Sequence, residues 1–81
     1  MKRIEWSSEK NEILKKTRNI SFEEILQNGT FLDDIPHPSR EKQRIKIYDY
    51  NGYPYLMPYV EDDEKIFLKT AFPNRDYKNL L

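Results

Sequence analysis

Two cations near the C-terminus, Lys69 and Arg75, are the residues best suited to chemistry in this sequence. They follow the apolar run 66–68, which is predicted to lie in a strand, and Thr70 stands next to the lysine. An ammonium and a guanidinium both bind phosphate oxygens, and the guanidinium does so with a two-pronged fork. The spacing therefore predicts a phosphodiester site, although lysines and arginines at strand ends are also common solvent-facing charges.

Cationic groups at this position suit RNA cleavage without a metal ion. In that reaction the ribose 2′-hydroxyl attacks the neighbouring phosphate, and a 2′,3′-cyclic phosphate forms. Negative charge grows on the non-bridging oxygens, where Lys69 and Arg75 would stabilise it. Arg44, Lys46 and Thr70 are the candidates for binding the RNA strand beside them.

His37 is the one histidine of the chain, and it stands between two prolines in a predicted loop. Prolines restrict the backbone, so the ring is expected to be held rigidly, as a general base or acid must be. Tyr59 is a second candidate, since a tyrosine can relay a proton or stack on a base. The alternative for His37 is an ordinary surface residue.

The length of 81 residues predicts a single domain, 1–81, with a small core. Aromatic residues reach 14%, and their large rings supply much of the burial in small cores. Lysine plus arginine and aspartate plus glutamate number 14 each, so the net charge alone does not predict nucleic-acid binding. The segment 40–46 is locally cationic, with four basic residues and one acid.

Several classes of protein are not expected. The chain has no cysteine, which excludes disulfides and most zinc sites, and the acidic run 61–64 lacks the spacing of a calcium-binding loop. No Walker loop, nucleophile elbow or dinucleotide fingerprint occurs, so neither a metal nor a cofactor is expected. No apolar stretch reaches the length of a membrane span and no signal peptide precedes the first predicted strand, which favours a cytoplasmic protein.

The N-terminal half is predicted to form a strand and two short helices. The strand covers 3–6, and an amphipathic helix covers 9–18. The second helix begins at Ser21, because Ser21 and Glu24 have the spacing of a capping box, and it ends at the pair 28–29, which is Asn-Gly.

The C-terminal half is predicted to form antiparallel strands. Residues 45–50 alternate strictly, Asn-Gly at 51–52 is a strong hairpin signal, and 53–60 returns as the partner strand. A third strand is predicted at 65–71 and a weaker one at 31–35, where two adjacent acids are unfavourable. The tail is expected to dock Tyr77, Leu80 and Leu81. This order predicts an α+β fold with a three- to four-stranded antiparallel sheet and the helices on one face.

The segment IEWSSEKNEILKKTRNISFEEIL resembles the N-terminus of BrnT-like toxins, which have a RelE-type fold and act in bacterial type II toxin–antitoxin systems. In these toxins a strand ending in an aromatic residue precedes a helix with a Lys-Asn pair and a second helix that starts Ser-Phe-Glu. The matching residues are Trp6, Lys10-Asn11, Ile20 and Ser21-Phe22-Glu23. The hairpin and the closing strand extend the likeness over most of the chain.

The resemblance implies a ribonuclease that cleaves mRNA and arrests translation, with a cognate antitoxin as its protein partner. The complex of such a toxin with its antitoxin often binds operator DNA. Two departures concern the basic residues. The family's Lys-His-Gly turn reads Thr17-Arg18-Asn19 here, and its strand-end arginine falls near Ala71.

Two other functions remain open from the sequence. The first is a non-catalytic interaction module that binds an antitoxin-like partner, which the zero net charge favours. The second is a phage or mobile-element protein of unrelated function. Expression of the chain, together with the identity of the neighbouring gene product, separates these from a ribonuclease.

Overall fold

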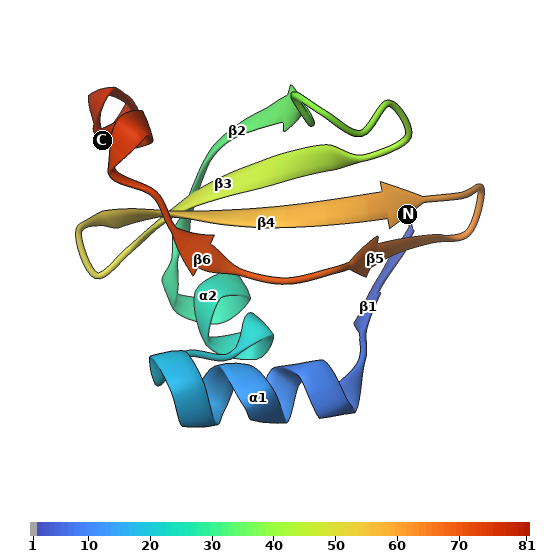
Figure 1. The fold of residues 1–81 in the computed structure, drawn as a ribbon, viewed down its shortest axis with the longest axis horizontal. Coiled ribbons are helices and arrows are strands. Elements are labelled where there is room, and N and C mark those ends of the chain that lie inside the picture. The colour runs from blue at the N-terminus through green and yellow to red at the C-terminus, as the bar shows by residue number, and fades with distance from the viewer. Residues whose placement is uncertain (1) are drawn as a thin grey trace.

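The computed structural model describes residues 2–81, in which a mixed β-sheet carries two helices on one face (Figure 1). The elements are β1 (Arg3–Trp6), α1 (Ser8–Arg18), α2 (Phe22–Asn28), β2 (Thr30–Pro36), β3 (Arg44–Tyr50), β4 (Tyr53–Glu61), β5 (Lys65–Leu68), β6 (Phe72–Pro73) and the 3₁₀ helix η1 (Arg75–Leu80). The predicted α+β class is confirmed.

The sheet is larger than predicted. Its strands lie in the order β1-β5-β4-β3-β2, and β6 pairs with a further part of β4. All the pairs are antiparallel except that of β1 with β5, which is parallel. The expectation of three or four antiparallel strands was therefore too low, because β1 and β6 join the sheet through pairings distant in sequence or only two residues long.

Local capping fixes the two helices. The Ser7 hydroxyl accepts a hydrogen bond of 3.2 Å from the Lys10 N–H, and the Ser21 hydroxyl accepts one of the same length from the Glu24 N–H. Asn19 ends α1 in the left-handed conformation, with φ of 57°. Such caps satisfy the amide groups that a helix leaves unpaired at its ends.

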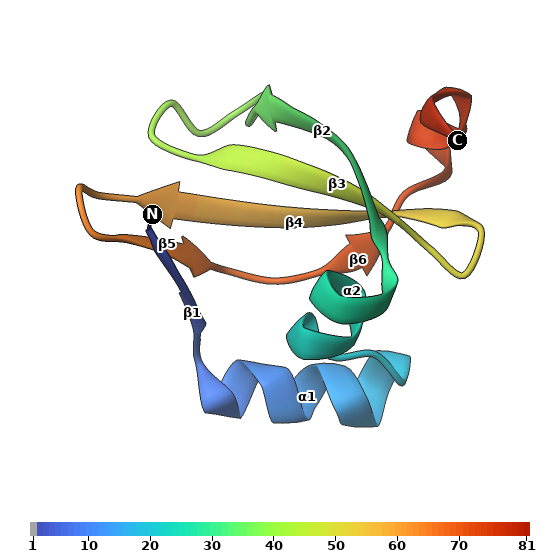
Figure 2. The same cartoon turned by 180° about the vertical axis from the view of Figure 1, so that it is seen from behind.

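The helices and the sheet enclose one apolar core between them (Figure 2). Leu14 of α1 and Ile25 of α2 are buried against the sheet residues Met57 and Leu68. In α1, only Asn11 and Leu14 are buried, so this helix is held to the rest by few residues.

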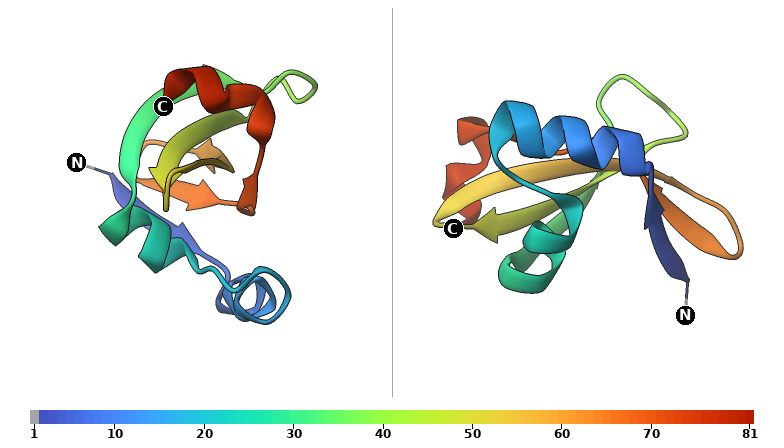
Figure 3. Two further views of the ribbon diagram at one scale, coloured as in Figure 1. Left: turned by 90° about the vertical axis from the view of Figure 1, so that its left-hand side faces the viewer. Right: turned by 90° about the horizontal axis from the view of Figure 1, so that it is seen from below.

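A second, smaller core lies on the opposite face of the sheet. The curled strand β2 and the helix η1 approach this face (Figure 3). Its buried and partly buried residues are Ile45, Ile47, Leu56, Leu32, Ile35, Phe72, Tyr77 and Leu80. The docking of Tyr77 and Leu80 agrees with the prediction, but that of Leu81 was wrong, since Leu81 is 52% exposed.

β2 tolerates its two acids because they have different environments. The pairing of β2 with β3 shifts register between Phe31 and Asp33, which is a β-bulge. Asp33 is exposed, whereas Asp34 lies opposite Lys46 on β3 and pairs with cations there. The weak strand predicted at 31–35 is therefore a seven-residue strand.

Candidate functional site

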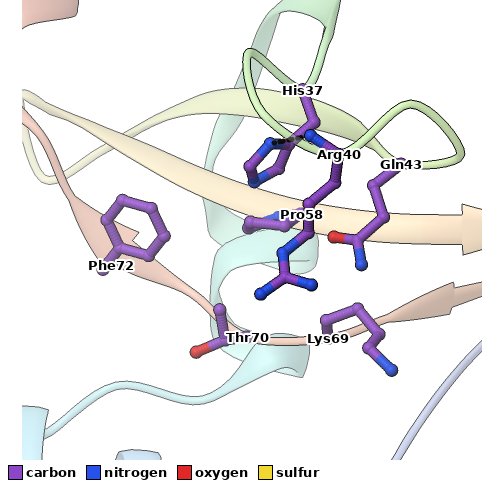
Figure 4. Close-up of a pocket in the computed structure, with 7 residues that line it drawn as sticks. All are labelled: His37, Arg40, Gln43, Pro58, Lys69, Thr70 and Phe72. Atoms are coloured by element: carbon purple, nitrogen blue, oxygen red, sulfur yellow. Dashed lines mark hydrogen bonds between the residues drawn. The ribbon is translucent and has the colours of Figure 1, made fainter.

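A cavity of about 390 Å³ opens on the face of the sheet opposite to α1 and α2. The loop between β2 and β3 forms one wall, β4 the floor, and the segment after β5 the other wall (Figure 4). The lining residues are His37, Arg40, Gln43, Pro58, Lys69, Thr70 and Phe72. Three of the residues predicted from the sequence, His37, Lys69 and Thr70, are thus brought together.

One extra residue between β5 and β6 places Lys69 and Thr70 in the cavity together. From the pair Tyr59–Leu68 to the pair Leu56–Phe72, β4 advances by 59 − 56 = 3 positions while the other segment advances by 72 − 68 = 4. In a regular strand, neighbouring side chains point to opposite faces. The bulge breaks this alternation, so both residues line the cavity.

The bulge also corrects the predicted third strand. The expected strand 65–71 ends at Leu68, and β6 begins only at Phe72. Between them the Lys69 N–H still donates a hydrogen bond of 2.7 Å to the carbonyl of Pro58. Proline offers no N–H in return, so a regular ladder cannot continue past this position.

The loop 37–43 is held by hydrogen bonds inside itself. The His37 N–H donates to the Gln43 carbonyl over 3.0 Å, and the Gln43 N–H donates to the Arg40 carbonyl over 3.0 Å. The guanidinium of Arg40 and the amide of Gln43 extend from this loop toward the segment that carries Lys69 and Thr70 (Figure 4). The loop thus directs polar groups from its wall of the cavity toward the opposite wall.

The ring of His37 is oriented by the backbone of its own loop. Its Nδ1 accepts hydrogen bonds from the N–H groups of Ser39, at 3.1 Å, and Arg40, at 3.2 Å. A nitrogen that accepts two N–H donors carries no proton, so the neutral ring has its proton on Nε2. This tautomer offers an N–H donor at Nε2.

The charge of the cavity is positive. Two of its lining residues, Arg40 and Lys69, are cations, and none of the seven is a carboxylate. The ammonium of Lys69 lies 5.9 Å from the centre of the Phe67 ring, beside the cavity. Within residues 2–81, neither Arg40 nor Lys69 forms an ion pair with a carboxylate.

Three of the predicted residues lie on the other face of the sheet. Arg44 pairs with Tyr59 across the strands, one position away from the floor residue Pro58. Alternate residues of a strand face opposite sides, so Arg44, Tyr59 and Lys46 point away from the cavity.

These three side chains converge on the carboxylate of Asp34. Arg44 Nε donates to Oδ1 over 2.8 Å, while the Tyr59 hydroxyl, at 2.6 Å, and Lys46 Nζ, at 3.2 Å, donate to Oδ2. Lys46 also lies 4.8 Å from the centre of the Tyr59 ring. We call these four residues the Asp34 network.

Burial and the hydrogen bonds of this network shift the pKa values of its carboxyl and phenol groups. Burial acts to raise the pKa of Asp34, but the hydrogen bonds from Tyr59, Arg44 and Lys46 outweigh it, and the pKa lies below its ordinary value. Burial and the hydrogen bond to Asp34 raise the pKa of Tyr59 to about 12. A phenol with so high a pKa stays protonated at neutral pH.

Arg75 does not line the cavity. It is exposed at the start of η1, beyond β6. The six positions from Lys69 to Arg75 contain the bulge and β6. Along these residues the chain continues past the cavity before η1 begins. Arg40 is the arginine that the structure places there instead.

Sequence reasoning missed Arg40, Gln43 and Asp34. The segment 40–44 reads as a polar loop, and its excess of cations was the available indication of a binding role. Asp34 carried no such indication, because its partners are brought to it by pairing across β3.

Residues 2–81 contain no group of three or more histidine, cysteine, aspartate or glutamate residues arranged to hold a metal ion. None of the helices in this range is sufficiently long and apolar to cross a membrane.

Comparisons with known proteins agree with this architecture. No protein-family model and no curated protein matches the chain in sequence. The crystal structure of the Brucella abortus ribonuclease toxin BrnT is similar to it, with a TM-score of 0.65 and 11% sequence identity. The likeness covers 91% of this chain and 97% of the BrnT chain. The chain therefore has the fold of a BrnT-like toxin, as its N-terminal sequence resemblance predicted.

Proposed function

We propose that this chain is the toxin of a type II toxin–antitoxin system and cleaves RNA without a metal ion. The observation that carries the proposal is the cavity itself, in which His37, Arg40 and Lys69 meet on the open face of the sheet. The fold shared with a ribonuclease toxin supports the same conclusion. A cationic cavity without a carboxylate suits a phosphodiester, since the phosphate is an anion at every physiological pH.

The reaction is an internal transfer at phosphorus. The ribose 2′-oxygen forms a bond to phosphorus, the bond to the 5′-oxygen breaks, and a 2′,3′-cyclic phosphate remains. The 2′-hydroxyl loses its proton and the leaving 5′-oxygen gains one, so protons balance. The added charge on the non-bridging oxygens is where Arg40 and Lys69 act, Arg40 with a fork and Lys69 as a mobile ammonium.

His37 would contribute an N–H donor. With Nδ1 engaged by two backbone amides, Nε2–H is positioned to donate to a phosphate oxygen. To act as a general base through Nε2, the neutral ring would have to carry its proton on Nδ1 instead. Nδ1 could then no longer accept the two backbone hydrogen bonds. We assign His37 the donor role, with the general base or acid role as the alternative.

The other predicted residues would not act on the reacting phosphate itself. Thr70 lines the cavity beside Lys69 and can donate its hydroxyl to the RNA strand. Arg75 on η1 would meet RNA that extends beyond the cavity. Arg44, Lys46 and Tyr59 are already bound to Asp34, which argues against direct contact with RNA.

The proposed biological setting follows from the toxin assignment. The chain would act in the cytoplasm on mRNA and arrest translation, and a cognate antitoxin would neutralise it. The complex of the two proteins would bind operator DNA.

The test is cleavage of a single-stranded RNA by the purified chain in EDTA. We expect fragments ending in a 2′,3′-cyclic phosphate, and translation arrest when the chain is expressed. Lys69→Ala and Arg40→Ala should each lower the rate by about 10²-fold, the scale of losing a group that stabilises transition-state charge. The matched control is Lys42→Ala, a cation of the same loop that is exposed and does not line the cavity.

Two results would contradict the proposal. Folded Lys69→Ala and Arg40→Ala proteins that cleave as fast as the wild type would remove the site from this cavity. A wild-type chain that cleaves no RNA, is harmless on expression and binds its neighbouring gene product would select the non-catalytic interaction module. That alternative is favoured by one observation: two of the expected RNA-binding cations are neutralised by Asp34.

A further inference from the structure

The Asp34 network lies directly behind the loop that forms one wall of the cavity. Asp34 is near the end of β2, and Arg44 is the first residue of β3. The loop that carries His37, Arg40 and Gln43 connects these two strands, and its base is the pair Pro36–Arg44.

Arg44 closes this base with two separate contacts to one residue. Its Nε donates to the Asp34 carboxylate over 2.8 Å, and its Nη2 donates to the Asp34 backbone carbonyl over 3.0 Å. A guanidinium fork held at two points has little freedom, so it fixes the ends of the loop relative to each other. The side chain of Asp34 is 25% exposed and that of Arg44 is 44% exposed, so solvent screens this contact only in part.

Tyr59 extends the same network to the opposite wall. Its hydroxyl reaches Asp34 from β4, across the intervening strand β3. The preceding residue, Pro58, lies in the floor of the cavity, and its carbonyl accepts the hydrogen bond from the Lys69 N–H. Asp34 is therefore linked through one side chain to each wall.

We infer that Asp34 is a positioning residue, which holds the loop 37–43 and the Lys69 segment at a fixed separation from behind the sheet. Two cations and a phenol converge on this one carboxylate, so its negative charge is needed and not only its shape. The effect on RNA cleavage rests on the proposed function, whereas the effect on the loop does not.

The test compares Asp34→Asn with the wild type. Asparagine keeps the size of the side chain but removes the charge that balances Arg44 and Lys46. The matched control is Glu24→Gln, which alters another carboxylate bound to a tyrosine hydroxyl, that of Tyr50, away from the loop. Tyr59→Phe is a milder variant that removes only one of the contacts to Asp34.

Two measurements are made on each protein. The first is hydrogen exchange of the His37 and Gln43 amides, whose N–H groups hold the loop closed. The second is cleavage of a single-stranded RNA over a range of RNA concentrations. For Asp34→Asn we expect faster exchange at both amides, and kcat lower by about tenfold or more with KM nearly unchanged, because misplaced groups cost transition-state stabilisation. Glu24→Gln should match the wild type in both.

The outcomes separate the inference from the function. If Asp34→Asn leaves the two amides as protected as in the wild type, the inference is overturned, whatever the cleavage rate. If Asp34→Asn binds RNA more tightly and cleaves faster, Arg44 and Lys46 are RNA ligands that Asp34 restrains, and the inference is again overturned. If the wild type cleaves no RNA, the proposed function fails and the amide exchange alone decides. If Asp34→Asn does not fold, Tyr59→Phe provides both readouts.

Discussion

The Lys69 N–H donates a 2.7 Å hydrogen bond to the carbonyl of Pro58. At this point the segment between β5 and β6 contains one residue more than the part of β4 that lies opposite it. On either side of this point the pairing with β4 is regular, since Leu68 lies opposite Tyr59 and Phe72 lies opposite Leu56. The cavity thus owes its second polar wall to a local irregularity of the backbone.

Deletion of Thr70 tests this description of the bulge. Without it, Lys69 and Ala71 would lie opposite Pro58 and Met57, and Ala71 would stay on the helix face, where it is now fully buried. We expect a folded protein with a melting temperature near that of the wild type. Deletion of Lys69 also restores regular pairing but removes the cation, so it should lose far more of any RNA cleavage.

The control for these deletions is removal of Ile66 within β5. That change shifts every following side chain to the other face and should prevent folding. Thermal unfolding of the three proteins provides the comparison. An unfolded Thr70 deletion would contradict the bulge.

The tautomer of His37 can be observed directly. Because it is the one histidine of the chain, the ¹⁵N signals of its ring need no assignment to a residue. We expect an unprotonated Nδ1 and a protonated Nε2 in the neutral ring, since Nδ1 accepts two backbone N–H groups. Signals from the opposite tautomer would favour the general base role for His37.

The hydrogen bond between Tyr59 and Asp34 predicts a loss of stability at high pH. The pKa of Tyr59 is about 12 when folded, above the ordinary value of 10.0, so the stabilisation is complete below pH 10 and disappears as the pH rises from 10 to 12. The loss should be roughly 2–3 kcal/mol, which two pKa units correspond to. Urea unfolding from pH 9 to pH 12 should show a larger loss in the wild type than in Tyr59→Phe, in which only the raised pKa values of tyrosines such as Tyr48 and Tyr50 still contribute.

Features encoded within a few residues were predictable from the sequence. The cap at Ser21 and the hairpin at Asn51-Gly52 both depend on local chemistry, and each occurs as expected. The parallel pairing of β1 with β5 was not predictable in this way, because about sixty residues separate the two strands.

The residues of the candidate site were likewise only partly predictable from the sequence. Lys69, Thr70 and His37 were recognised by residue type, and the cavity contains all three. Arg75 was grouped with Lys69 by distance along the chain, which a bulge and β6 make a poor guide to distance in space. The role of Asp34 depends on strand register, which the sequence of β2 does not specify.

Asn11 should be important for stability rather than for chemistry. It is 6% exposed, its Oδ1 accepts the Phe22 N–H over 2.9 Å, and its Nδ2 donates to Glu23 over 2.9 Å. Asn11→Ala leaves the buried Phe22 N–H without a partner, which should cost about 1–3 kcal/mol of unfolding free energy. Asn28→Ala, at an exposed position of α2, should change it by less than about 0.5 kcal/mol.

Two neighbouring residues of α1 provide the sharpest test of how this helix is held. Leu14 is 1% exposed in the core between helices and sheet, whereas Ile13 is 45% exposed. Leu14→Ala should lower the unfolding free energy by about 2–5 kcal/mol, because it removes the one buried apolar side chain that α1 contributes. Ile13→Ala should cost less than about 0.5 kcal/mol, since alanine favours the helix and little burial is lost. Urea unfolding of both variants measures the difference. Equal losses would mean that α1 packs through another face, and a large loss only at Ile13 would reverse the orientation of the helix.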